Sequence, residues 1–177
     1  DDDSFCRNVL VNIGYYRLSA YFLPFKSFDG TYMDNLSFKR VYRVYEFDRK
    51  LRNLLFSAIE VIEVSLRTRL AHFHSEKYGA LGYLDASSFN SKHNADKFKL
   101  NIDREIENNK KVLFVKHHID NYDGQFPLWV ISELFTFGML SYFYNDLITA
   151  DKKAFAGADY RNMISWMRCC TDLRNIC

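Results

Sequence analysis

Proline and glycine are scarce in this chain, with two prolines and seven glycines among 177 residues. Because these residues interrupt helices and mark turns, their scarcity favours long regular elements. Hydrophobic residues make up 48% and aromatic residues 17% of the sequence, which argues against disorder and allows a sizeable core. We expect a single domain over residues 1–177.

An excess of charge of either sign is also missing, since 24 Lys and Arg residues oppose 22 Asp and Glu residues. The net charge of +2 is too small to indicate nucleic-acid binding by itself, so any such site must come from a local cluster. No secretory signal is visible, and the default location is a reducing cytoplasm.

The cysteines, histidines and glutamates of this sequence are not spaced as metal ligands are. The four cysteines are Cys6, Cys169, Cys170 and Cys177, and the adjacent pair cannot share an ion in the usual motifs. His72 and His74 diverge on a helix, as do His117 and His118. Glu60 and Glu63 share a face, but no Glu-x-x-His accompanies them. We therefore expect neither a metal nor a cofactor.

No stretch alternates apolar and polar residues as a strand does, whereas helical spacing of three and four recurs throughout. The sequence predicts an all-α fold, a bundle of four or five main helices with short accessory ones. The apolar stretch that begins at Pro127 is a buried helix or a membrane span, and Glu133 and Gly138 favour the bundle. The expected helices cover 1–12, 38–75, 95–122, 127–147 and 159–177.

Arg174 falls inside the apolar stripe of the last expected helix. A guanidinium on a buried helix face is costly unless it is paired, and Asp172 points away from it. Arg174 therefore either pairs with another helix or lines a polar pocket. The helical spacing of apolar residues continues as far as Cys177, and no Gly or Pro follows to end the helix. We therefore expect the natural protein to continue, and the sequence to be trimmed at both ends.

Two further charged positions are candidates for pairing. Glu133 lies in an apolar stretch and must be protonated, paired or pocket-lining, and Arg174 or Arg69 would be a suitable partner. A structural ion pair and a role in supporting an active site both remain open for it. Arg67 follows Glu63 by four residues, and we interpret these two as an ion pair on a helix surface.

A basic run interleaved with aromatic residues is a candidate RNA-binding surface, because phosphate contacts and base stacking need such a mixture. The alternative is a solvated helix face over core aromatics. The aromatic residues are Phe38, Tyr42, Tyr45 and Phe47, the opposing acids are Glu46 and Asp48, and the basic residues are Lys39, Arg40, Arg43, Arg49, Lys50 and Arg52.

Several stretches together resemble the Abi-like (AbiD/AbiF) abortive-infection family, part of the HEPN superfamily. The resemblance spans nearly the whole chain. The stretches are Ile13-Gly14-Tyr15-Tyr16-Arg17-Leu18-Ser19, Phe47-Asp48-Arg49-Lys50-Leu51-Arg52 with Glu63-Val64-Ser65-Leu66-Arg67-Thr68, Pro127-Leu128-Trp129-Val130 with Glu133-Leu134, and Leu173-Arg174-Asn175-Ile176-Cys177.

The resemblance implies a helical bundle that forms a homodimer and a metal-independent RNase, with RNA as its substrate. The HEPN motif is an Arg, usually followed by a polar residue, with a His after four to six intervening positions. Arg174 and Asn175 match its start as catalytic residues, with Glu133, Arg67 and Glu63 in support. The family continues from Arg-Asn-Ile-Cys into Ala-His-His, so a chain that ends at Cys177 should be inactive.

Three functions remain open on this basis. The first is a toxin-like RNA endonuclease of phage defence that cleaves by attack of the 2′-OH, with an antitoxin RNA or protein as a further partner. The second is a non-catalytic module that binds RNA or a protein and uses Arg174 in a structural ion pair. The third is a helical scaffold without activity.

Overall fold

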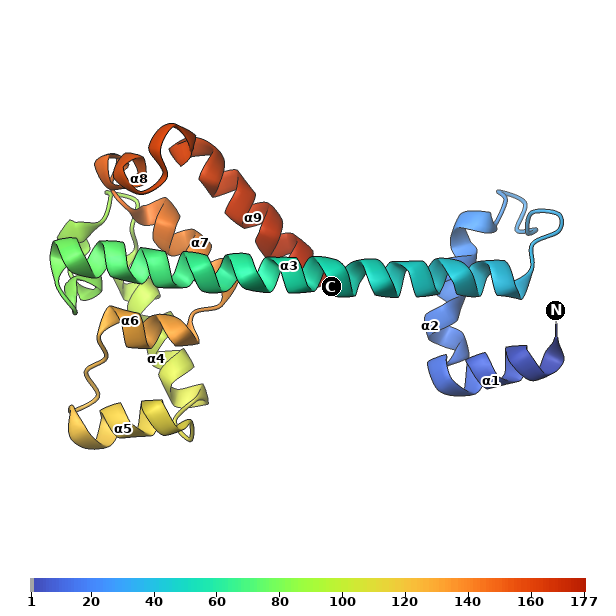
Figure 1. Cartoon of the computed structure of the whole chain (residues 1–177), viewed down its shortest axis with the longest axis horizontal. Helices are drawn as coiled ribbons and strands as arrows, with labels where there is room; N and C mark the ends of the chain where they lie inside the picture. The colour runs from blue at the N-terminus through green and yellow to red at the C-terminus, as the bar shows by residue number, and fades with distance from the viewer. Residues whose placement is uncertain (1) are drawn as a thin grey trace. The chain divides into compact units, whose positions relative to one another are not determined.

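The computed structural model describes residues 2–177, and every regular element in that range is helical (Figure 1). The same residues form no β-strand and only two isolated bridges, Lys26–Tyr32 and Phe89–Leu147. The all-α prediction is confirmed. No described helix is both long and apolar enough to cross a membrane. The chain divides into two compact units, one up to Phe56 together with Cys177, and one covering Ser57–Ile176.

The first unit is built around aromatic side chains. Val9 of α1 and Leu18 of α2 pack with Tyr45 of α3 in its core. The rings of Phe5 and Tyr42 meet edge to face with their centroids 5.4 Å apart, a favourable geometry for two aromatic rings. Its elements are α1 (Asp3–Ile13), α2 (Tyr15–Ser19), the 3₁₀ helix η1 (Ala20–Phe25) and the first part of α3 (Phe38–Tyr78).

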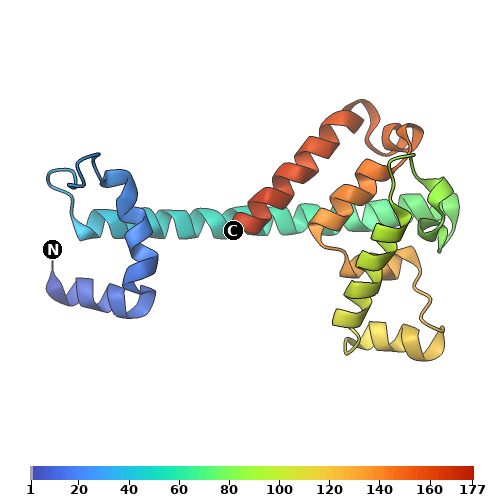
Figure 2. The same cartoon turned by 180° about the vertical axis from the view of Figure 1, so that it is seen from behind.

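The second unit contains the rest of α3 and all later elements. Within it, α7 and α9 lie side by side in both views (Figures 1 and 2). The elements are η2 (Gly82–Leu84), η3 (Ala86–Ser88), α4 (Ala95–Asn108), α5 (Leu113–Asn121), α6 (Leu128–Ile131), η4 (Ser132–Leu134), α7 (Phe137–Asp146), α8 (Thr149–Ala156), η5 (Gly157–Asp159) and α9 (Tyr160–Ile176).

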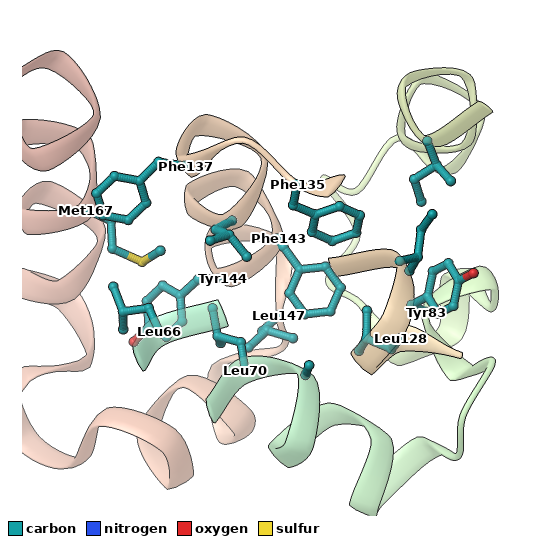
Figure 3. Close-up of a cluster of buried hydrophobic side chains, with 14 of the residues drawn as sticks. Leu66, Leu70, Tyr83, Leu128, Phe135, Phe137, Phe143, Tyr144, Leu147 and Met167 are labelled. Atoms are coloured by element: carbon teal, nitrogen blue, oxygen red, sulfur yellow. The ribbon is translucent and has the colours of Figure 1, made fainter. Parts of the chain in front are cut away.

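The core of the second unit collects side chains from α3, α6, α7 and α9. Figure 3 shows Leu66 and Leu70 of α3 among Phe143 and Tyr144 of α7, with Met167 of α9 beside them. Each such residue stabilises the fold by about 1.5–3 kcal/mol when its side chain is fully buried. This core fixes the face of α3 that carries the charged residues described below.

Two expected helices are interrupted, and the helices α2 and α8 were missed. The stretch 95–122 is divided because Asn109 ends α4, its side-chain amide donating to the Glu105 carbonyl at 2.8 Å. The stretch 127–147 is divided because Phe135 is extended and Thr136 caps α7 by accepting from the Met139 N–H at 3.2 Å. The helix α8 lies outside every expected range.

The buried His74 makes the stability of the fold depend on pH. It packs against Phe89 and Phe143, its Nδ1 has no partner among the described residues, and burial lowers its pKa from 6.5 to about 4. Of the nearby charges, Asp151 raises the pKa of His74 and Lys77 lowers it.

We expect the free energy of unfolding to fall as the pH drops from about 6.5 to 4. In that window the unfolded chain binds a proton at residue 74 that the folded chain excludes, which costs roughly 3 kcal/mol by pH 4. Urea denaturation across this range should show a shallower pH dependence for His74→Leu. His72→Gln, at an exposed position of the same helix, should behave as the wild type, and equal slopes in all three would contradict the prediction.

Candidate functional site

Glu63 is a buried carboxylate at the centre of a charged cluster in the second unit. It is only 5% exposed because it shares a face of α3 with the core residues Ile59, Leu66 and Leu70. Arg67, one turn later, donates from Nη2 to its Oε1 at 2.7 Å. Arg174 of α9 places Nε 2.7 Å from its Oε2. The Glu63–Arg67 pair is confirmed, but its place on the surface is wrong, since both side chains are largely buried.

Arg174 forms an ion pair with Glu63, in which Nε is its closest atom. Of the two alternatives for this residue, the structure shows pairing with another helix, α3. Its Nη1 and Nη2 make no hydrogen bond with any residue between 2 and 177, and its side chain is 37% exposed. A guanidinium oriented by a carboxylate at Nε and open at its terminal nitrogens can bind an anion such as a phosphate.

Arg67 connects this pair to the turn before α7. Its Nη2 also donates to the carbonyl of Phe135 at 3.1 Å, which is available because the chain leaves the helical conformation there. Its Nη1 lies 3.8 Å from Oε2 of Glu133, and its Nε is buried without a partner among the described residues. The side chain is therefore fixed in place by three oxygen atoms.

The expected pairing of Glu133 is wrong. Its partner is Arg67 rather than Arg174 or Arg69, and the guanidinium of Arg69 instead lies 5.2 Å from the ring centroid of Phe155. Glu133 is also not a buried charge, since 54% of its side chain is exposed. The break in the helix at 127–147 places it on the surface, where no desolvation cost has to be compensated.

Asn175 is exposed at the end of α9, and its side chain makes no hydrogen bond with the rest of the described chain. It is the residue directly after Arg174. The structure therefore brings together Glu63, Arg67, Glu133 and Arg174, while Asn175 remains free to contact a ligand.

The basic run in the first unit is largely paired within the unit. Glu46 holds Arg49 at 3.0 Å, and Asp48 holds Arg52 together with the hydroxyl of Tyr21. Arg40 lies over the ring of Phe25. The hydrogen bond from Arg49 lowers the pKa of the Glu46 carboxyl, with a smaller contribution from the charge of Lys50, and Lys39 and Arg43 are exposed.

The aromatic residues of the same run belong mainly to the core. Tyr45 is buried, Phe38 and Tyr42 pack against it, and only Phe47 is mainly exposed. Much of the pattern that suggested a mixed RNA surface is thus explained by a packed helix face.

Among the described residues, no group of three His, Cys, Asp or Glu side chains could hold a metal ion. The four cysteines are free thiols. The charged cluster thus consists of carboxylates and guanidiniums alone, which can hold and orient an anionic substrate.

Sequence reasoning missed several residues around this cluster. The carbonyl of Phe135 and the buried hydroxyl of Ser132 take their places from the break before α7, which Thr136 signals as an N-cap. Trp129 was noticed only as part of a motif, yet its half-exposed ring lies next to the cluster's surface.

A family model described as Abi-like protein matches residues 8–177. The match includes both units and every residue of the charged cluster. No curated protein and no solved structure matches the chain.

Proposed function

This chain belongs to the Abi-like family of abortive-infection proteins, and from that premise we propose that it is a metal-independent RNA endonuclease of the HEPN type. The observation that supports the proposal best is the geometry of Arg174. It forms an ion pair with a buried carboxylate, with Nε 2.7 Å from Oε2 of Glu63, while 37% of its own side chain stays exposed.

The proposed reaction is attack of a ribose 2′-OH on the adjacent phosphate. The attack forms a bond to phosphorus, and the 5′-oxygen of the next nucleotide leaves, giving a 2′,3′-cyclic phosphate. Arg174 stabilises the additional negative charge on the phosphorane oxygens. The proton transfers need a general acid and base, a role the family resemblance gives to histidines placed after Cys177.

Glu63 and Arg67 act in this proposal as positioning residues. Glu63 holds Arg174 through Nε, and Arg67 holds the second oxygen of Glu63, so neither needs to touch the substrate. Asn175 is free to contact the RNA beside Arg174. Lys39 and Arg43 are the members of the basic run that remain most available for phosphate contacts in the first unit.

A homodimer completes the proposal, because each chain supplies the motif once. Exposed apolar side chains support it. Val61 and Ile62 of α3 are 70% and 41% exposed, and Leu173 and Ile176 of α9 are 40% and 68% exposed. We propose that a second copy covers some of these side chains.

The second candidate is a non-catalytic module that binds RNA or a protein. It is favoured by the burial of Glu63, because a buried carboxylate needs cations whether or not catalysis takes place. In that case Arg174 is a structural partner only.

The nuclease is tested by incubating total bacterial RNA with the protein in EDTA. We expect a version that carries the motif's histidines after Cys177 to produce fragments ending in 2′,3′-cyclic phosphate, and residues 1–177 alone to produce none. Cleavage that depends on added metal would contradict the mechanism. The absence of cleavage by both versions would favour the binding module, which RNA-binding measurements on the same proteins would then examine.

A further inference from the structure

Trp129 separates two surface hollows in the second unit. One, of about 510 Å³, is lined by α3 and by the α6–η4 segment, and its wall includes Ser75, Ser132 and Glu133. The other, of about 650 Å³, includes His118 and Tyr122. Both volumes lie in the range of small-molecule sites. The first hollow shares Glu133 with the charged cluster, so it borders the proposed catalytic site.

The backbone that carries Trp129 is firmly anchored, although its side chain is exposed. Leu128 and Ile131 on either side are buried in the core, and the N–H of Leu128 donates to the carbonyl of Ala80 at 2.9 Å. The residue is 53% exposed, and its indole makes no aromatic ring pair or hydrogen bond with other residues in the described range. An uncovered aromatic ring carried by an anchored backbone can act as a stacking platform for a flat ligand.

Two residues that line the 510 Å³ hollow carry buried hydroxyls without a partner in the described part of the chain. Ser132 is 2% exposed, and its Oγ and the Oγ of Ser75 make no hydrogen bond within the described chain. Such groups are uncommon in folded proteins, and a ligand or a water molecule usually satisfies them. Both residues line the hollow, but their oxygens lie beneath its surface, so the base contacts of an occupant have to come from exposed groups such as Glu133.

The negative charge of this hollow favours the base of a nucleotide over its phosphate. Glu133 and Glu76 contribute carboxylates to its wall, whereas no Lys or Arg does. A phosphate is repelled by such a wall, but a base whose edge donates hydrogen bonds is attracted. Guanine carries two neighbouring donors, N1–H and the 2-amino group, which match the two oxygens of one carboxylate, and uracil has no amino group.

We propose that this hollow is a nucleobase subsite that prefers guanine in RNA, with the base stacked on Trp129 and donating to Glu133. The inference rests on the proposed nuclease function, and it adds a substrate preference to it. The carboxylate that would bind the base lies 3.8 Å from Nη1 of Arg67, so the proposed subsite borders the arginine cluster.

The two tryptophans allow a direct test with guanosine 5′-monophosphate. Trp166 is 52% exposed on α9, so Trp166→Phe leaves Trp129 as the sole indole, and Trp129→Phe is its matched control. We expect a saturable change in fluorescence with this nucleotide in Trp166→Phe and none in Trp129→Phe. Glu133→Gln in the Trp166→Phe background should weaken binding about 5- to 100-fold, the range for losing one bidentate base contact.

Uridine 5′-monophosphate and inorganic phosphate are the control ligands. Equal responses to the two nucleotides, a response to phosphate alone, or no saturable response at millimolar concentration would overturn the subsite. Chemical-shift changes of the Trp129 indole N–H in the unmodified chain give the same answer without relying on a variant that must fold. Binding without any RNA cleavage would remove the nuclease proposal but not the subsite, whereas cleavage that ignores guanine would remove the subsite alone.

Discussion

In the version that carries the motif's histidines after Cys177, Arg174→Ala is expected to lower the rate of RNA cleavage about 10²- to 10³-fold, the usual loss when one donor to a developing oxyanion is removed. The ion pair with Glu63, in which Nε lies 2.7 Å from Oε2, helps to position the guanidinium before the substrate binds. We expect the protein to remain folded, because Glu63 keeps Arg67 as a partner at 2.7 Å and the loss of stability should be only about 1–2 kcal/mol. The cleavage rate under single-turnover conditions measures the effect.

Two variants separate catalysis from a merely structural role. Arg174→Lys keeps a cation near Glu63 but lacks the planar fork, so it should recover stability without recovering most of the activity. Arg168→Ala, an exposed arginine on the same helix, should cleave RNA as the wild type does. If Arg174→Ala instead cleaves RNA normally and unfolds at a much lower temperature, Arg174 is a structural residue and the binding module becomes the better proposal.

The need for a partner at Arg174 was predictable from the sequence, whereas the partner was not. Helical spacing alone places the guanidinium on an apolar face, and the cost of burying it requires a counter-charge. Which carboxylate supplies it depends on how α9 packs against α3, and the sequence suggested only Glu133. The pairing was misjudged because Glu63 already had an obvious partner in Arg67, and a carboxylate with two oxygens can hold two arginines.

The long helix was likewise predictable from the sequence, whereas the breaks in two other expected helices were not. The long helix was expected at 38–75 and observed as Phe38–Tyr78, because its apolar spacing persists and Gly79 ends it with a φ of 81°. The breaks at Asn109 and Phe135 were missed because hydrophobic spacing continues across them. Only side-chain capping by Asn109 and Thr136 signals them, and such signals are local and easily overridden.

The hollow beside Trp129 was beyond the reach of the sequence. It is formed by α3 and the α6–η4 segment, which are more than fifty positions apart in the chain. A half-exposed tryptophan in an apolar stretch looks like a core residue until the break before α7 is known. The same break moved Glu133 from a supposed core position to the surface.

Glu63→Ala is expected to lower the free energy of unfolding by about 3–5 kcal/mol, since it leaves two guanidiniums without their carboxylate. Arg67 is the more affected, because it is largely buried and its Nε already lacks a partner among the described residues. Urea denaturation at neutral pH measures the change. Glu60→Ala, at an exposed position one turn earlier, should stay within about 0.5 kcal/mol of the wild type. A Glu63→Ala protein as stable as the wild type would mean that water replaces the carboxylate.

A double replacement, Glu63→Leu with Arg67→Leu, should recover most of the stability that Glu63→Ala loses. Apolar side chains of similar volume can fill the site of a buried ion pair at little or no cost, and Arg174 is exposed enough to turn toward solvent. Cleavage should not return, however, because nothing then orients the guanidinium of Arg174. A double variant that is both stable and fully active would show that catalysis does not need the oriented arginine. A stable but inactive one would show that the buried charges are kept for the reaction and not for the fold.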